Sequence, residues 1–379
     1  MSDSQHTNPW RSLNDADTIA EKLKLIHEVM VPHMPHITRI AVALYDPETD
    51  YLRTFVYSSK EESPLTHYEA KLAECVSLGE IAASGEPRVV NDLSVFNRYG
   101  EEHQHTQRIY DAGLRSSYTL PMQWNGHFFG FVFFNGDEEG VFEERLLTEL
   151  DVIAQMITLL IYNERNNVRV LLATIKSALD FSHSRDPETG GHLERMSRYA
   201  QLIAQALAPA HGLDDQYVEH IYLFAPLHDL GKLSIPDRIL MKEGPLSETE
   251  LEVMRTHAEE GRNLIDKLLL NYGLNGVTHV EMLRNIALHH HEALDGTGYP
   301  DRLVGSAIPL EARIVAVADV FDALTSRRPY KDAWSNHRAF EELRNLAGVK
   351  LDPECVEALI QRSDQVEEIQ RLFKENRFG

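Results

Sequence analysis

Histidines and carboxylates recur through the second half of the chain at positions where metal coordination could use them. The stretch 289-HHHEALDGTGYP-300 places three consecutive histidines and a glutamate before a glycine-rich turn. Upstream, His228 and Asp229 are adjacent at the end of a largely apolar segment, where imidazole and carboxylate groups need partners. Three neighbouring side chains on one backbone cannot all point at one ion, so other segments must supply the remaining ligands.

Three further segments each offer an ionisable group. His192 lies four residues after Glu188, which puts both on one face of a helical turn. Asp319 interrupts the apolar run 313-RIVAVADVFDAL-324, where an unpaired carboxylate would be costly to bury. His257 lies between polar residues and by itself would be interpreted as a surface histidine.

The donor types indicate what such a site would bind. Imidazole nitrogens and carboxylate oxygens without cysteine suit iron or manganese better than a structural zinc ion. More than four ligands imply more than one ion. Paired ions held by His and Asp typically hydrolyse phosphoesters, because the metals clamp the phosphoryl oxygens and activate a water.

The motifs HDLGKLSIPDRIL, LEVMRTHAEEG, HHEALDGTGYPDRLVG and IPLEARIVAVADVFDALTSRRPYKDAW follow one another in this order. They resemble the HD-GYP family of cyclic di-GMP phosphodiesterases over about residues 170–370. The resemblance implies hydrolysis of cyclic di-GMP to linear pGpG, and on to GMP where a third metal binds. The positions that match the family's metal ligands are Glu188, His192, His228, Asp229, His257, His290, His291 and Asp319.

Within that set, Asp229 is expected to bridge ions and to be catalytic. Glu188 matches the acid that permits a third metal in some members of the family. The resemblance therefore implies two or three metal ions, with iron first and manganese next.

The same resemblance implies contacts with the substrate. Lys232 matches the lysine after the HD pair, which would hold a phosphate oxygen and offset developing charge. Arg328 and Lys331 match the basic positions that grip the substrate phosphates. Asp322, one helical turn after Asp319, is expected to orient a ligand or to face the substrate.

The glycine-rich turn has its own set of expectations. Tyr299 would shape the substrate pocket or present a surface to a diguanylate cyclase domain, a contact linked to this loop in the family. His289 should diverge from the site, because a helix rotates by about 100° per residue. Glu292 is left open between orienting a ligand and capping the turn. Gly296 and Gly298 permit positive φ and predict a tight loop.

The first half predicts an antiparallel sheet with helices packed against it. Asn125-Gly126 favours a type I′ turn between two strands. The remaining periodicities predict strands over 37–46, 53–59, 87–93, 118–123 and 128–134, and helices over 17–30 and 65–84. This order resembles a GAF domain, a sensory module, over roughly residues 17–165. No motif indicates a ligand for it.

The helical pattern continues through 142–180 and then dominates the chain. Apolar residues recur at steps of three and four, with a polar break at 163-NERNN-167. We expect a continuous helix that joins the domains and supports a homodimer; the alternative is two ordinary amphipathic helices. Further helices are predicted over 192–210, 215–231, 247–269 and 310–326.

These patterns predict two domains: an α+β GAF-like unit over 17–165, after a flexible tail 1–16, and an all-α HD-domain bundle over 166–379. The net charge of −22 over 379 residues argues against a nucleic-acid polymer as partner. Cys75 and Cys355 are expected to be buried hydrophobes. The polar start, and the absence of an apolar run of about 20 residues, predict a cytoplasmic protein without a membrane segment.

Two alternatives remain open at the level of sequence. The substrate could be another cyclic dinucleotide, such as cyclic GMP-AMP, because residues that grip phosphates do not distinguish bases. The second half could also be a non-catalytic sensor of cyclic dinucleotides, although none of the family's ligand positions is missing.

Overall fold

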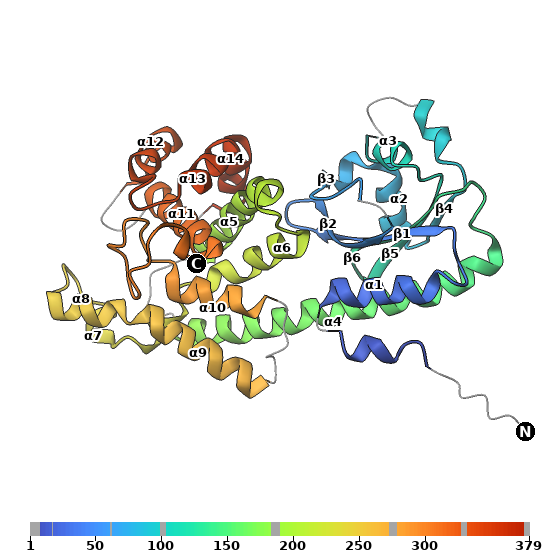
Figure 1. Cartoon of the computed structure of the whole chain (residues 1–379). Helices are drawn as coiled ribbons and strands as arrows, with labels where there is room; N and C mark the ends of the chain where they lie inside the picture. The colour runs from blue at the N-terminus through green and yellow to red at the C-terminus, as the bar shows by residue number, and fades with distance from the viewer. Residues whose placement is uncertain are drawn as a thin grey trace, which may run out of the picture. The chain divides into compact units, whose positions relative to one another are not determined.

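The computed structural model describes residues 8–16, 18–60, 63–98, 104–182, 190–272, 279–326 and 332–374. The chain divides into two compact units, Met1–Asn166 and Asn167–Gly379 (Figure 1). The first is an antiparallel sheet with helices, and the second is helical, as the sequence predicts.

The first unit is built on a six-stranded antiparallel sheet in the order β3-β2-β1-β6-β5-β4. Asn125 and Gly126 both have positive φ, 49° and 77°, so the predicted hairpin between β5 and β6 is confirmed. The strands are β1 (Ile37–Asp46), β2 (Tyr51–Ser59), β3 (Glu69–Lys71), β4 (Arg88–Val90), β5 (Ser116–Trp124) and β6 (His127–Gly136).

Helices cover both faces of this sheet (Figure 1). One core joins Ile40 and Val42 of β1 to Leu150 and Ile157 of helix α4 and to α1. The other joins Ala43 and residues of β6 to α2. The helical segments are η1 (Arg11–Asn14), α1 (Ile19–Met30), η2 (Leu72–Glu74), α2 (Val76–Ser84), η3 (Leu93–Arg98), α3 (Gln104–Asp111) and α4 (Glu144–Ser182).

The predicted helix over 65–84 was wrong in its first half. Residues 69–71 form the edge strand β3, whose Lys71 pairs with Tyr51 of β2. The backbone of Tyr68 also accepts a hydrogen bond from Thr54 at 3.0 Å. Pairing with a neighbouring strand thus outweighs the local helical spacing, and only α2 remains of the predicted helix.

Helix α4 is continuous through the polar break, as predicted. Its 27-residue stretch Glu144–Val170 is long and apolar enough, by length and composition alone, to cross a bilayer. It is not an uninterrupted apolar run, because charged residues such as Glu149 and Asp151 interrupt it. Leu150, Ala154, Ile157 and Ile161 are nevertheless buried on the sheet at helical spacing, as in the core helix of a folded domain.

The second unit is a bundle of helices around one large core. Among its described residues, strand pairing is limited to the isolated bridges Asp295–Val304 and Ala347–Leu351. The elements are α5 (Gly190–His211), α6 (Asp215–Phe224), η5 (Ala225–Leu227), η6 (Leu230–Ser234), α7 (Asp237–Leu240), α8 (Glu248–Arg255), α9 (His257–Tyr272), α10 (Val280–His289), η7 (Gly305–Ala307), α11 (Leu310–Thr325), α12 (Asn336–Leu346), α13 (Pro353–Ile360) and α14 (Ser363–Leu372).

Two predicted helices are broken in ways that matter for the site. The segment 215–231 is helical only to Phe224, because Pro226 lacks an N–H and short 3-10 turns follow. The segment 247–269 divides at Thr256, whose hydroxyl donates to Val253 O at 2.7 Å. Both breaks set a histidine, His228 or His257, at the end of a helical segment.

Replacing Ile157 by Ala should lower the free energy of unfolding of the first unit by about 2–5 kcal/mol, because the side chain is 1% exposed. Val152→Ala on the same helix is the control: Val152 is 70% exposed and should change stability by less than about 0.5 kcal/mol. Calorimetric unfolding of both variants tests this, and equal effects would contradict the assigned helix face.

Candidate metal centre

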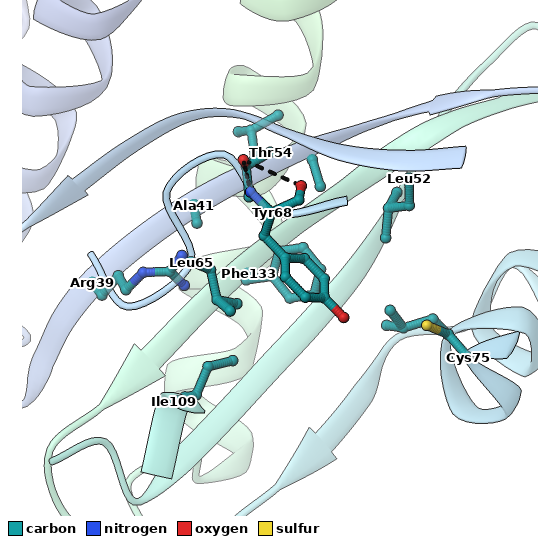
Figure 2. A pocket seen from close by; sticks show the side chains of 12 residues that line it. Arg39, Ala41, Leu52, Thr54, Leu65, Tyr68, Cys75, Ile109 and Phe133 are labelled. Carbon is teal, nitrogen blue, oxygen red and sulfur yellow. Dashed lines mark hydrogen bonds between the residues drawn. The ribbon is translucent and has the colours of Figure 1, made fainter. Parts of the chain in front are cut away.

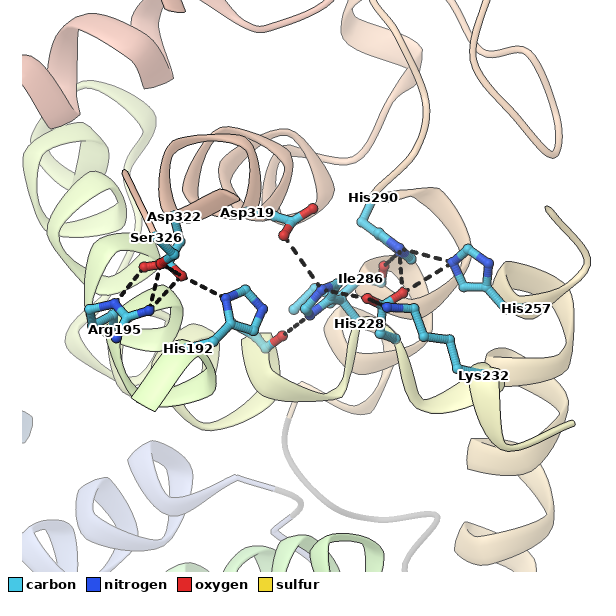
Figure 3. A network of polar contacts seen from close by, with 12 residues as sticks. His192, Arg195, His228, Lys232, His257, Ile286, His290, Asp319, Asp322 and Ser326 are labelled. Atoms are coloured by element: carbon cyan, nitrogen blue, oxygen red, sulfur yellow. Dashed lines mark hydrogen bonds and ion pairs between the residues drawn. The ribbon is translucent and has the colours of Figure 1, made fainter. Parts of the chain in front are cut away.

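Two groups of possible ligands converge in the second unit. Asp229, His257, His290 and His291 form one group; His192, His228 and Asp319 form the other. In each group the candidate ligand atoms lie within 4.8 Å of one another. These residues come from α5, the η5–η6 region, α9, the end of α10 and α11 (Figure 3). Glu188, the remaining predicted ligand, lies outside the described residues.

The Asp229 carboxylate lies between the two groups. Its Oδ1 is 3.2 Å from His257 Nε2 and 3.6 Å from His290 Nε2. Its Oδ2 is 3.2 Å from His228 Nε2 and 2.8 Å from Lys232 Nζ. One oxygen therefore faces each group, which is the arrangement that a bridging carboxylate requires.

Backbone carbonyls fix the rings of three of these histidines. The Nδ1 atoms of His228, His257 and His290 lie 2.9, 2.8 and 2.9 Å from the carbonyl oxygens three or four residues earlier. A carbonyl only accepts, so each Nδ1 carries the proton and donates. In the neutral ring, Nε2 is then the basic nitrogen, and it is the atom aimed at Asp229.

His192 is oriented by a carboxylate instead. Its Nδ1 lies 2.7 Å from Oδ2 of Asp322. Asp322 is fully buried, and it also accepts hydrogen bonds from Arg195 at 2.7 and 2.9 Å and from Ser326 at 2.8 Å (Figure 3). Both of its oxygens are therefore engaged behind the metal ligands, which fits the predicted orienting role and leaves none for a substrate.

Arg195 and Ser326 were missed by sequence reasoning. Arg195 follows His192 by three residues, and Ser326 follows Asp322 by four, so helical spacing was the available signal. Burial raises the pKa of Asp322, but the hydrogen bonds from His192 and Arg195 outweigh it and hold that pKa below its ordinary value. The group therefore remains an anion inside the bundle.

Electrostatics favour the metal-binding forms of the central residues. Burial opposes ionisation of Asp229, but the charge of Lys232 and the close approach of His228 and His257 lower its pKa well below the usual value. Burial and the neighbouring His290 lower the pKa of His291 to about 2. Asp229 is thus a carboxylate, and His290 and His291 are neutral imidazoles, which are protonation states that bind metals.

Close backbone packing brings Asp229 and His257 together. A Cβ atom on Gly231 would overlap His257 O and Gly261 N of helix α9. Segment η6 therefore rests directly on α9, which only glycine at position 231 allows. The same contact sets Lys232 beside the site.

The glycine-rich loop is held beside the candidate metal ligands by Glu292. Its carboxylate accepts the backbone N–H groups of Asp301 at 2.7 Å and Leu303 at 3.0 Å. A Cβ on Gly298 would come within 2.5 Å of Glu292 Cα, so the loop needs glycine there. Of the two roles left open for Glu292, the observed contacts are those of a loop cap.

Tyr299 and His289 point in different directions. Tyr299 packs on His291, with ring centroids 4.8 Å apart and an interplanar angle of 29°. His289 Nε2 contacts Asp301 at 3.0 Å and belongs to neither group of candidate ligands. Arg328 and Lys331, the predicted phosphate-binding residues, lie outside the described residues.

The family model described as HD domain matches residues 183–355. The chain is 45% identical over 227 residues to the cyclic di-GMP phosphodiesterase response regulator RpfG of Xanthomonas campestris, covering 60% of this chain and 53% of that protein. It is 36% identical over 252 residues to the 3'3'-cGAMP-specific phosphodiesterase 2 of Vibrio cholerae, covering 62% and 46%. The chain spans about half the length of the curated relatives it matches.

Solved structures match the sheet unit weakly. The GAF domain of an Acinetobacter phosphoenolpyruvate-protein phosphotransferase has a TM-score of 0.33 at 13% identity, covering 42% of this chain and 90% of that one. A GAF domain/HD domain protein from Geobacter sulfurreducens has a TM-score of 0.32 at 14% identity, covering 40% and 95%. Scores of this size add no argument to what the sheet itself shows.

Gly231→Ala should lower the free energy of unfolding of the second unit by about 1–3 kcal/mol, because the added methyl overlaps the backbone of α9. Gly261→Ala on the facing side of the same contact is the comparison: its Cβ would lie 3.3 Å from Gly231 N, a much milder approach, and alanine favours a helix by up to about 1 kcal/mol, so its loss of stability should be smaller. Thermal unfolding of both variants tests this prediction. A Gly231→Ala protein as stable as the unmodified protein would contradict the close contact.

Proposed function

We propose that the chain, whose residues 183–355 match the family model described as HD domain, is a metal-dependent phosphodiesterase that hydrolyses cyclic di-GMP to linear pGpG. The observation that carries this proposal is the Asp229 carboxylate, with one oxygen toward each group of histidines. Relatives named as cyclic di-GMP phosphodiesterases, including RpfG and a Thermotoga maritima protein at 39% identity, support the substrate.

The donor set fits a dinuclear centre. His257, His290 and His291 would hold one ion and His192, His228 and Asp319 the other, with Asp229 between them. When bound, the ions supply Lewis acidity at the phosphoryl oxygens and an activated water. We propose iron as the physiological metal, with manganese next, because borderline first-row ions accept this mixture of nitrogen and oxygen donors.

The chain's own residues position the substrate in this proposal. Lys232 Nζ, 2.8 Å from Asp229, would hold a phosphate oxygen and offset its charge. Tyr299 forms a wall beside His291. Arg328 and Lys331 would grip the phosphates and supply the local positive charge that a chain of net charge −22 needs. Asp322 acts through His192 instead of touching the substrate.

The second candidate substrate is 3'3'-cyclic GMP-AMP. It is favoured by the similarity to the 3'3'-cGAMP-specific phosphodiesterase 2 of Vibrio cholerae. Residues that hold phosphates do not distinguish guanine from adenine. Competition between the two dinucleotides at equal concentration separates the candidates. A purely sensory role is disfavoured, because every candidate ligand among the described residues is present.

Regulation and assembly complete the proposal. The sheet unit would act as a GAF-type sensory domain for the enzyme, in the cytoplasm. A homodimer through this unit and α4 is supported by apolar side chains left on the helix surface, since Val170 is 49% and Leu159 36% exposed. The loop at Tyr299 would be the surface for a diguanylate cyclase domain.

Asp229→Asn should lower turnover of cyclic di-GMP by at least about 100-fold. Losing a partner of a ligand already costs about 10–100-fold in activity or metal affinity, and Asp229 lies between both groups of ligands. Product formation by the purified, metal-loaded protein is measured by chromatography. Asp301→Asn, which alters the acid that contacts His289, should retain turnover. An active Asp229→Asn protein with an unchanged melting temperature would rule out this mechanism.

Metal dependence should be visible both in the metal content of the protein and in the reaction product. Protein purified without oxygen should contain two or three iron ions per chain, chelation should abolish turnover, and added iron or manganese should restore it. Glu188→Gln should remove one ion, leave pGpG formation intact and stop its conversion to GMP. Elemental analysis with product identification tests this, and full turnover in metal-free protein would contradict it.

A further inference from the structure

The sheet unit buries a positive charge that has only neutral partners among the described residues. Arg39, near the start of β1, is 2% exposed. Its Nη1 donates to Asn135 Oδ1 at 2.7 Å, and its Nε and Nη2 donate to Ser63 Oγ, both at 3.2 Å. No carboxylate of the described ranges pairs with it. Desolvation by burial accordingly lowers the pKa of Arg39 to about 10.

Two N–H groups of the Arg39 guanidinium have no hydrogen-bond acceptor among the described residues. Of its five N–H groups, Nε and one on each terminal nitrogen are used by Asn135 and Ser63. One N–H on each of Nη1 and Nη2 has no acceptor among the described residues. Two such groups on neighbouring nitrogens match the two oxygens of a carboxylate.

A cavity of about 40 Å³ lies next to this guanidinium (Figure 2). One water molecule needs only about 10–15 Å³ on this measure. The cavity lies between the sheet and the segments that cover this face. Its lining is Arg39, Ala41, Val42, Ala43, Leu52, Thr54, Leu65, Tyr68, Cys75, Leu78, Ile109 and Phe133.

The sequence of β1 explains why this space stays open. Arg39, Ala41 and Ala43 alternate along the strand and therefore share one face of the sheet. On the opposite face the larger Ile40 and Leu44 fill the core shared with α1 and α4, and Val42 both joins that core and lines the cavity. Two alanines in the middle of a central strand leave room that the covering side chains do not fill.

The polar groups of the lining other than Arg39 are already engaged or neutral. Thr54 Oγ1 pairs with the backbone of Tyr68. Burial raises the pKa of the Cys75 thiol, so it remains protonated. Figure 2 shows Arg39 and Cys75 on opposite sides of the cavity, with the Tyr68 ring between them. The wall of the cavity is thus largely apolar, and Arg39 is its one cationic lining residue.

We propose that this cavity is a binding site for a small organic carboxylate, whose anionic group pairs with Arg39 and whose short apolar chain contacts the alanine-lined wall. Burying a guanidinium without a counter-charge is costly, and a bound carboxylate would remove that cost. The cavity of about 40 Å³ suits molecules of about three to four non-hydrogen atoms, by comparison with the roughly 10–15 Å³ that one water needs.

The test titrates the full-length protein with acetate, propionate and butyrate, and with the neutral amide of each, by calorimetry and thermal shift. At least one carboxylate should bind and raise the melting temperature of the sheet unit, with its amide at least tenfold weaker. Arg39→Met should lose at least tenfold in affinity for that carboxylate. If no carboxylate binds, or acid and amide bind equally, the proposal fails.

Two further variants separate binding from folding. Ala41→Ile keeps Arg39 but fills the cavity, so it should abolish binding without lowering the melting temperature of the ligand-free protein. Arg53→Met is the matched control, since Arg53 on the neighbouring strand pairs with Glu69 at 3.1 Å and does not line the cavity. Its affinity should equal that of the unmodified protein. Equal binding by the Arg39 and Arg53 variants would overturn the assignment.

Discussion

The sharing of one carboxylate, Asp229, between two sets of imidazoles is the constraint on which the second unit depends. Imidazoles packed together inside a protein disfavour one another's protonated forms, and a carboxylate among them offsets this repulsion. Asp229 is that carboxylate, and Lys232 keeps it ionised. The helices around it can therefore bring polar groups into a largely apolar bundle without leaving a charge uncompensated.

The framework around Asp229 is made of main chain more than of side chains. Carbonyl groups at the ends of short helical segments orient His228, His257 and His290, and Gly231 lets two segments meet backbone to backbone. The breaks in these helices therefore orient the candidate ligand side chains. Such a framework fixes ring orientation before any ion is bound, as preorganised sites require.

Sequence reasoning was sufficient for features that local chemistry determines. The turn at Asn125-Gly126 and the strands on either side follow from backbone preferences, and the ordered motifs led to the candidate ligands. It was insufficient for features that depend on contacts between segments far apart in the sequence. The strand at 69–71 exists because β2 offers it partners. His257 has the local pattern of a surface residue, and Arg195 acquires a role only when Asp322 is brought to it from α11.

The hydrogen bond from His192 to Asp322 joins positions 130 residues apart. Its consequence concerns the order in which the site can form. Forming a contact between residues so far apart in sequence has a large entropic cost, which is lower once the intervening chain has folded. We therefore expect this contact to form late. The group around His257 and His290 can assemble from α9 and α10, whereas His192 stays unoriented until α11 docks. Both groups of candidate ligands are therefore complete only when the whole helical bundle has folded.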